Sequence, residues 1–432
     1  MSYSITGIDV HKKILAVVSA DVSVEGEYCY QRRKCGATAG ELRRLAAWLI
    51  EHEVEEVVME STAQYWRPVW AELEQHWRPV MQRREGAGPM AGKLHLAQAK
   101  SNRGRRGRKN DYRDAERLVR RLVAQELVLS FVPEPEQRLW RTLTRRKQQL
   151  IKDRVRFQNR LEALLEQMHI KLSGQMTDLL GVSSRRMLKA LAEGATDPVV
   201  VAALADPGLR ATQEQLRDAL AACVDLLPVY RRLLKMELEE LNFLEEEMDK
   251  LERETAELLQ AHSAAVKRLA EVPGLGVDSA QQIIAEIGPT AAVFPSAGLL
   301  ASWVGVCPGE NVTADEKHAT RSPKGNRNMR RLLNQAAHAA VKMKGSIFEV
   351  VFHRLLPRME YKKAIWCIAH RLCCLIWKIL HQGVRYEERG PAVSDKAKRA
   401  RLAKMIRELS KAGYRVEVPI LQQAPPVAEQ PA

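Results

Sequence analysis

The sequence predicts a mixed α/β N-terminal domain, then long helices, then a mainly helical C-terminal domain. Three observations support this prediction. β-branched and alternating runs fill the start of the chain, long stretches with apolar residues at helical spacing follow, and Pro, Gly and Ser interrupt the last third. A chain of 432 residues is long enough for two or three domains. We place the domains at 1–133, 134–262 and 263–390, with a charged and Pro/Gln-rich tail at 391–432.

In the N-terminal domain, the runs between residues 3 and 33 predict strands, because β-branched residues favour a pleated, half-buried surface. An amphipathic helix is expected at 39–52, and a short apolar strand at 54–61. A second helix is expected at 63–76, and a further strand near 78–82. Strands and helices in this order predict a mixed sheet that is covered by helices.

Two nearby prolines in "FVPEPEQ" disfavour a helix and mark the end of this domain. From 138 to 262, apolar residues recur at helical spacing among dense charge, which predicts two long helices with a coiled-coil seam. Residues 171–225 between them are expected to form a smaller helical insertion. We interpret the two long helices as a spacer or an assembly arm.

The formal net charge of +15 favours a polyanionic partner, nucleic acid before an anionic membrane, although a merely soluble basic surface has the same composition. No uninterrupted apolar run approaches the roughly 18 residues of a spanning helix, and the start of the chain lacks a secretory pattern. The seven scattered cysteines argue against a disulfide framework and a zinc site. We therefore expect a cytoplasmic protein without a membrane partner.

Four carboxylates stand at positions that an α/β fold can bring together. Asp9 and Glu60 each end an expected strand, and strand ends are where such folds collect ligands. Asp111 and Asp114 begin a helix and, being three residues apart, lie on one face of it. Oxygen donors of this kind suit one or two Mg²⁺ ions, and four converging carboxylates would repel one another without a cation or basic neighbours.

A glycine-containing basic run precedes the two aspartates and is suited to binding phosphates. Its cations are Arg103, Arg105, Arg106, Arg108 and Lys109. Each carboxylate also has an ordinary alternative role, because Asp111 could cap its helix and Asp114 could pair with Arg117. The combination Asp–Glu–Asp-x-x-Asp in this order is more specific than any single residue.

The sequence around these residues resembles the DEDD transposases of the insertion sequence 110 family. The matching pieces are "GIDVHK" with Asp9 and Lys12, "MESTAQYW" with Glu60, and "KNDYRDAERL" with Asp111 and Asp114. The resemblance implies an α/β RNase H-like N-terminal domain, similar to the RuvC Holliday-junction resolvase, in which the four carboxylates bind Mg²⁺. It covers most of the chain, and the helical insertion and the tail are less typical.

In the C-terminal domain, "VPGLGVDSAQQIIAEIG" places Gly274 and Gly276 before an apolar-periodic helix. Glycines permit a tight turn that points backbone N–H groups outward at a helix start, where a phosphate can bind. The segment resembles a helix-hairpin-helix, which binds the nucleic-acid backbone without reading bases. An ordinary turn between two helices is the alternative.

The phrases "G-x-C-P-G" and "KGN-x-x-x-R" resemble the C-terminal transposase domain of the same family, in which a serine in the intervening loop attacks DNA. Thr313 occupies the matching place in this chain and keeps the hydroxyl, but its methyl group crowds an attack. Ser322 is the nearest serine and lies at a different offset. The resemblance implies Thr313 as the nucleophile, or a copy that has lost this function.

Positive or potentially positive side chains surround this loop, and we expect them to contact phosphate oxygens unless they form only a solvated basic surface. They are Lys317, His318, Arg321, Lys324, Arg327, Arg330 and Arg331. The apolar helix expected at 362–383 belongs to the core, with His370 as a structural residue.

Together these features predict a DNA transposase or site-specific recombinase that moves its own insertion sequence. The resemblance also implies a structured guide RNA, a homo-dimer or homo-tetramer, and an active site composed across subunits. Two alternative hypotheses stay open. One is a RuvC-like structure-selective nuclease that uses water, and the other is a catalytically decayed transposase that only binds nucleic acid.

Overall fold

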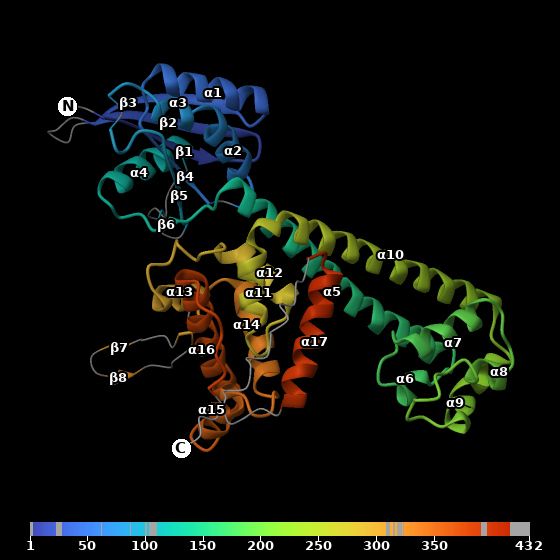
Figure 1. The fold of residues 1–432 in the computed structure, drawn as a ribbon. Coiled ribbons are helices and arrows are strands. Elements are labelled where there is room, and N and C mark those ends of the chain that lie inside the picture. The colour runs from blue at the N-terminus through green and yellow to red at the C-terminus, as the bar shows by residue number, and fades with distance from the viewer. Residues whose placement is uncertain are drawn as a thin grey trace, which may run out of the picture. The chain divides into compact units, whose positions relative to one another are not determined.

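The computed structural model describes residues 3–22, 28–61, 63–86, 88–99, 102, 110–307, 322, 324–389 and 395–414, and it describes only the backbone at 312–313, 316–317 and 395–398. The chain folds into two compact units. The first unit ends at Pro133, and the second begins at Glu134. Each unit is described by itself, with the element labels of Figure 1.

The N-terminal unit is built on a six-stranded mixed sheet with the order β3-β2-β1-β4-β5-β6. β1, β4 and β5 run parallel, whereas β2, β3 and β6 are antiparallel to their neighbours (Figure 1). The strands are β1 (Tyr3–Val10), β2 (Ile14–Val22), β3 (Tyr28–Gly36), β4 (Glu56–Glu60), β5 (Lys93–Ala97) and β6 (Leu129–Ser130). This mixed sheet with helices is compatible with an RNase H-like domain.

Helices cover both faces of the sheet because both faces of its central strands are apolar. Ile8 and Val10 of β1 share a core with α1 (Ala39–Glu51), α2 (Trp66–His76) and α3 (Arg78–Gln82). Ile5 points to the opposite face, since side chains alternate along a strand, and packs with Val119 of α4 (Asp111–Val123). The helix α4 therefore covers the face to which the odd-numbered residues of β1 point.

One predicted element of this unit is wrong. Residues 78–82 form the helix α3 rather than a strand, and Pro79 lies in its first turn, where a missing N–H leaves no hydrogen bond unmade. The structure instead has the strand β5, which the sequence did not predict. Its residues from Lys93 to Leu96 alternate polar and apolar, which favours a strand, but the run is only five residues long and was not recognised.

In the C-terminal unit, two long helices, α5 (Pro135–Gln167) and α10 (Pro228–Leu258), lie side by side (Figure 1). Both begin with a proline at a position that favours a helix start. Charged residues pair between them, for example Arg154 with Glu245 at 3.1 Å. The coiled-coil geometry of this pair remains a prediction.

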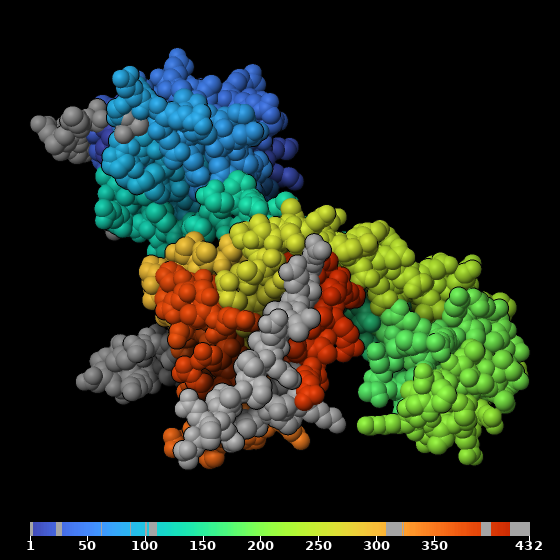
Figure 2. All heavy atoms as spheres, viewed as in Figure 1, coloured from blue at the N-terminus to red at the C-terminus, as the bar shows by residue number. Residues whose placement is uncertain are grey.

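A small helical lobe, green in Figure 2, connects the two long helices, and its Met187, Leu188 and Leu216 share a core with buried residues of both of them. The lobe lies within the predicted insertion at 171–225. Its helices are α6 (Leu172–Gln175), α7 (Val182–Ala192), α8 (Pro198–Ala202), α9 (Gln213–Leu220) and the short 3-10 helix η1 (Ala221–Cys223).

The rest of the C-terminal unit packs around α16, in which Ile368, Leu372 and Ile376 are fully buried. α16 is the one described helix that is long and apolar enough to cross a membrane, but a buried core helix passes the same test, and nothing else in the described residues indicates a membrane protein. The elements are η2 (Gln260–His262), α11 (Ser263–Ala270), α12 (Val277–Ile287), α13 (Ala297–Val304), β7 (Val312–Thr313), β8 (Glu316–Lys317), α14 (Arg327–Ala340), α15 (Ile347–Leu355), α16 (Tyr361–Gln382) and α17 (Asp395–Lys411).

Candidate functional site

Asp9 and Glu60 lie near the carboxyl ends of two neighbouring parallel strands. β1 and β4 pair with Ile8 opposite Met59, so Asp9 and Glu60 are the next residues in the same register. Side chains at matching positions of adjacent strands point to the same face of a sheet. Gly7, two residues before Asp9, contacts α4, so both carboxylates lie on the face that α4 covers.

Gly7 lets α4 approach β1 closely. A Cβ at this position would lie 2.4 Å from the carbonyl oxygen of Ala115 and 2.9 Å from a side-chain carbon of Val119. Since no other residue fits without moving the helix, Gly7 sets the separation of β1 and α4. This close approach places the first turn of α4 beside the end of β1.

Asn110 determines where α4 begins. Its side-chain oxygen accepts hydrogen bonds from the backbone N–H groups of Tyr112 and Arg113, at 3.1 and 3.4 Å. The cap is therefore Asn110, and the alternative role of Asp111 as the cap is wrong. Asp111 and Asp114 lie in the first turn, where the partial positive charge of the helix N-terminus stabilises a carboxylate.

His11 bridges Asp9 and Asp111. Its Nε2 lies 3.1 Å from Asp9 Oδ2 and 3.3 Å from Asp111 Oδ1. One ligand atom from each of the three residues lies within 4.8 Å of the other two. The side chain of Asp9 is 12% exposed and that of Asp111 is 51% exposed, so the cluster is closed on the sheet side and open on the helix side.

Glu60 and Asp114 have different neighbours. Asn102 donates a hydrogen bond from Nδ2 to Glu60 Oε2 at 2.9 Å. Its other side-chain atom, Oδ1, is buried and has no hydrogen-bond partner among the described residues. Asp114 forms an ion pair with Arg117 one turn further along α4, as the ordinary alternative for this residue predicted.

The structure thus joins Asp9 and Asp111 in one cluster and places Glu60 on the same face. Sequence reasoning missed His11, Asn102 and Gly7. His11 follows Asp9 in the same quoted motif, and its closeness to the strand end was the available signal. The sequence offered no such signal for Asn102, because Asn102 and Glu60 are far apart along the chain and meet only in the fold.

The ligand atoms of this cluster fit a divalent cation. Carboxylate oxygens are the ligands that Mg²⁺ prefers, and an imidazole nitrogen is a common ligand of transition metals. Asp9 and Asp111 are like charges that share one imidazole, and a bound cation would offset their repulsion. The buried Asn102 Oδ1 is a further oxygen beside Glu60. The group therefore suits a divalent metal, and the choice of metal is a separate question.

The predicted nucleophile lies in a two-stranded antiparallel sheet of the C-terminal unit. β7 and β8 pair with Thr313 opposite Glu316, and Lys317 belongs to β8. Only the backbone is described here. The predicted nucleic-acid contacts that lie outside the described residues are Arg103, Arg105, Arg106, Arg108, Lys109, His318 and Arg321.

The predicted motif from Lys324 to Arg330 is anchored to the end of α13. Lys324 is exposed, whereas a Cβ on Gly325 would lie 2.1 Å from the carbonyl oxygen of Val304. Arg330 donates to the carbonyl oxygen of Gly305 and, at 3.2 Å, to Ser322 Oγ. This arginine therefore joins the described residues on both sides of the segment that contains Thr313.

Arg331 lies deeper and donates a hydrogen bond to Gln282 Oε1 at 2.6 Å and another to Gln335 Oε1 at 2.8 Å. Burial lowers the pKa of its guanidinium below the ordinary value, against the opposing effect of Asp278 and Glu286. These amide contacts use one N–H of each terminal nitrogen, and its Nε is buried without a hydrogen-bond partner among the described residues, so Arg331 is held by its neighbours rather than directed to the surface.

Behind the start of α14, one buried carboxylate joins three helices. Glu286 of α12 accepts hydrogen bonds from Arg145 through both oxygens, at 2.8 and 2.9 Å, and from Asn326 and Asn328, each at 3.0 Å. The guanidinium of Arg141 lies 3.7 Å from the same carboxylate. Burial would raise the pKa of Glu286, but these partners outweigh it and hold the pKa below its ordinary value. We call these five residues the Glu286 cluster.

The two glycines of the predicted phosphate-binding turn have defined packing roles. Gly274 adopts a φ of +84°, and a Cβ there would lie 2.2 Å from the carbonyl oxygen of Ala336 in α14. Gly276 precedes the first residue of α12, and its Cβ position lies 3.1 Å from Glu408 Oε2. The turn therefore packs on α14, and phosphate binding by it stays a prediction.

Comparisons with known proteins match both parts of the chain. A family model for DEDD transposases of the IS110 type, described as "Transposase", matches residues 6–170. A second, described as "Transposase IS116/IS110/IS902 family", matches residues 266–351. A curated relative from Streptomyces coelicolor (strain ATCC BAA-471 / A3(2) / M145), "Insertion element IS110 uncharacterized 43.6 kDa protein", is 26% identical over 153 residues. That match covers 35% of this chain and 37% of the relative, so the chain spans little more than a third of the relative's length.

Proposed function

Because the chain belongs to the IS110 family of transposases, we propose that it is a DNA transposase, a site-specific recombinase that cleaves and exchanges the strands of an insertion sequence. The observation that supports this most directly is the meeting of Asp9, His11 and Asp111 at the end of β1, with Glu60 beside them on the same face. The net charge of +15 agrees with a polyanionic substrate.

The metal belongs to the N-terminal unit. The four predicted carboxylates would hold one or two Mg²⁺ ions, and His11 would orient Asp9 and Asp111 or add a nitrogen ligand. When bound, Mg²⁺ offsets charge on the phosphate oxygens and favours the attacking oxygen anion. Arg117 contacts Oδ1 of Asp114, so Asp114 would bind a metal through its other oxygen or by exchanging this ion pair.

The nucleophile belongs to the C-terminal unit. The Thr313 hydroxyl loses its proton and its oxygen attacks the scissile phosphorus, forming a new P–O bond. The bond from phosphorus to the 3′ oxygen breaks, and that oxygen takes a proton and leaves as a free hydroxyl. Attack by another strand's 3′ hydroxyl on the phosphothreonine then forms the recombinant phosphodiester and restores Thr313. Each step exchanges one phosphate ester for another.

The partners are DNA and a structured guide RNA, and the working form is a homo-dimer or homo-tetramer. A helix-hairpin-helix formed by α11 and α12 would contact the DNA backbone through the turn at Gly274 and Gly276. The predicted basic residues would bind further phosphates, and base pairing with the RNA would select the sequence. The family resemblance and the basic charge support these assignments.

A search for a covalent adduct tests the proposal. The protein is mixed with DNA of its element ends, the RNA encoded beside it, and Mg²⁺, and protein–DNA adducts are sought under denaturing conditions. We expect an adduct with the unaltered protein and with Thr313→Ser, and none with Thr313→Ala or Asp9→Asn. Ser302→Ala, which removes an exposed hydroxyl of α13, is the control and should keep the adduct.

Two other results would replace this proposal. Cleavage without any adduct indicates a structure-selective nuclease that uses water. Salt-sensitive binding without cleavage indicates a transposase that has lost catalysis, in which Thr313 is a decayed nucleophile.

A further inference from the structure

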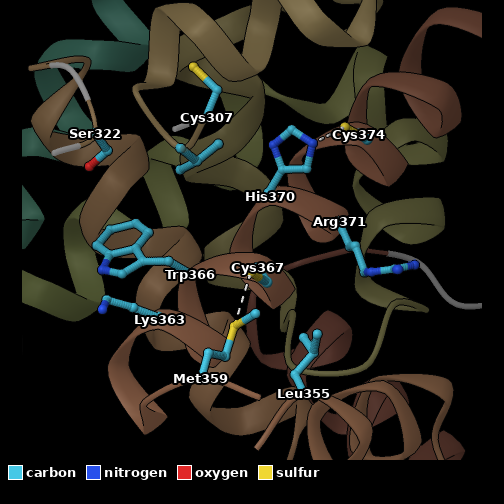
Figure 3. A pocket seen from close by; sticks show the side chains of 11 residues that line it. Cys307, Ser322, Leu355, Met359, Lys363, Trp366, Cys367, His370, Arg371 and Cys374 are labelled. Atoms are coloured by element: carbon cyan, nitrogen blue, oxygen red, sulfur yellow. Dashed lines mark hydrogen bonds between the residues drawn. The ribbon is translucent and has the colours of Figure 1, made fainter. Parts of the chain in front are cut away.

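We propose that a pocket in the C-terminal unit binds an unstacked nucleobase of the nucleic-acid strand, an inference that rests on the proposed function. The pocket has a volume of about 890 Å³ and lies between α16, α15 and the residues on both sides of segment 308–321 (Figure 3). This volume is in the range of sites for small organic ligands. We call it the base pocket and define it by Cys307, Ser322, Lys363, Trp366, His370 and Arg371.

Trp366 gives the base pocket an aromatic surface. Its half-buried indole is part of the pocket lining, and the guanidinium of Arg330 lies 4.7 Å from its ring centroid. This contact holds the ring in place before any ligand arrives. Stacking on an aromatic side chain is available to every base, because each base has a π face. Trp366 can therefore bind a base without selecting its sequence.

Most of the remaining lining is apolar or sulfur-containing, as expected for a site that receives the flat face of a base. Among its polar members, His370 has an unsatisfied ring nitrogen. Its Nε2 makes a weak contact with Cys374 Sγ at 3.6 Å, and its Nδ1 is buried without a hydrogen-bond partner among the described residues. A turn of the ring that offers this nitrogen to a base edge would form a hydrogen bond that Nδ1 now lacks.

The charges of the base pocket complement a nucleotide. Lys363 and Arg371 are exposed, and the described lining contains neither Asp nor Glu. Lys363 also pairs with Glu360 at 3.6 Å, but both side chains are exposed, so this ion pair is weak and easily exchanged for a phosphate. A nucleotide can therefore place its phosphate beside these cations and its base inside.

The position of the base pocket connects it to the proposed reaction. Cys307 precedes segment 308–321, which contains Thr313, and Ser322 follows it, and both residues line the pocket. Both ends of the segment that contains Thr313 therefore lie at the base pocket, so a base of a strand bound by this segment can enter the pocket when it leaves the stack. Enzymes that act on nucleic acid commonly bind a base outside the stack. The free energy of unstacking is smallest when the nucleic acid is single-stranded.

Photo-crosslinking tests the base pocket. Element-end DNA that carries 5-iodouracil at one position at a time is bound to the full-length protein, irradiated, and analysed by peptide mass spectrometry. We expect one position near the cleavage site to crosslink to Trp366. An abasic nucleotide at that position should weaken binding roughly tenfold in the unaltered protein and have no further effect in Trp366→Ala. Trp366→Phe should keep most of the affinity.

Trp377→Phe is the matched control, since Trp377 lies on the same helix and is not part of the pocket lining. The base pocket is overturned if the DNA binds but does not crosslink to Trp366, and if the abasic nucleotide weakens binding equally in the unaltered protein and in Trp366→Ala. That result leaves the proposed function intact. Failure to bind element-end DNA at low salt overturns both. If Trp366→Ala does not fold, the crosslinks of the unaltered protein and of Trp366→Phe decide the question.

Discussion

The two units use carboxylates in opposite ways. In the Glu286 cluster, one carboxylate that is only 4% exposed accepts hydrogen bonds from an arginine and two asparagines, and a second arginine lies nearby. At the end of β1, two aspartates share a single histidine, and one of them is 51% exposed. The protein balances the first charge itself, whereas the second group leaves room for a cation.

We interpret the first carboxylate as structural and the second group as the proposed metal site. A buried carboxylate whose partners neutralise it holds helices together, and removing it leaves charged partners without compensation. Carboxylates gathered at strand ends repel one another, which lowers the stability of the fold. A bound metal ion can offset this repulsion. The predictions below test the contrast.

Asp9→Asn should give the largest effect. The amide keeps the shape of the side chain but removes a negative charge from the metal cluster, so Mg²⁺-dependent DNA cleavage should fall by about 10³-fold, the equivalent of several kcal/mol of metal-ion stabilisation. Without metal, the free energy of unfolding should change little, because the relief of repulsion with Asp111 opposes the loss of a charged partner for His11. Cleavage rates and denaturant unfolding measure the two effects.

The control is Asp21→Asn, which alters an exposed aspartate of the same sheet. If Asp9→Asn cleaves as fast as the control, the acidic group at the end of β1 is not the reaction site.

Glu286→Gln should reduce the stability of the fold and leave metal binding unchanged. The change leaves Arg141 and Arg145 beside an uncharged group, so the free energy of unfolding should fall by about 3 kcal/mol. This is the low end for a broken buried pair, because the Arg145 side chain is 38% exposed and can reach water. Metal affinity of the N-terminal unit should not change. Urea unfolding and metal titration provide the comparison, with the exposed Glu254→Gln as the control.

Much of the fold could be predicted from periodicity. The first strands, α1, α2 and the two long helices follow from apolar spacing of two or of three to four residues. Residues 78–82 were misassigned because a run of five residues with Val80 and Met81 fits a strand and a helix equally well. β5 was missed although Lys93 and His95 alternate with leucines, because the run is only five residues long and its strand character depends on pairing with β4.

The candidate site could be predicted only in part. The order of four acids and the family resemblance indicated Asp9, Glu60, Asp111 and Asp114. His11 could have been found from its place two residues after Asp9. Asn102 acts through a contact with Glu60 and Gly7 through the close approach of α4, and a sequence does not display either. The same holds for Glu286, whose partners come from α5 and from the start of α14.

Gly7→Ala should damage the site through the backbone. The new Cβ would meet the carbonyl oxygen of Ala115 at 2.4 Å and push α4 away from β1, at a cost of about 1–3 kcal/mol in the free energy of unfolding. The shift should also separate Asp111 from Asp9 and weaken Mg²⁺ or Mn²⁺ binding. Calorimetric metal titration and urea unfolding test both effects. Gly40→Ala is the control, because nothing lies within 4 Å of its Cβ position.

Asn102→Ala should have a smaller effect, which is confined to the affinity for the metal. Asn102 donates to Glu60, and removing a partner that orients a metal ligand typically weakens metal binding about tenfold. Metal titration measures the change, and the exposed Asn159→Ala serves as the control. Equal affinities in the two variants would mean that Glu60 does not depend on Asn102, and would weaken its assignment as a ligand.

Acid should reduce the contribution of Glu286 to the free energy of unfolding, and this should be the smallest effect of the series. The folded pKa of Glu286 lies below its ordinary value of 4.5, so the unfolded chain binds the proton first as the pH falls. The stabilisation is complete above pH 4.5 and is lost as the pH falls through the folded pKa. Glu286→Gln lacks this group, so its stability deficit relative to the unaltered protein should narrow in acid. Urea unfolding of both proteins between about pH 7 and pH 3 measures the gap. A gap that stays constant would show that Glu286 has the same pKa in the folded and unfolded states, which contradicts a carboxylate neutralised by Arg145.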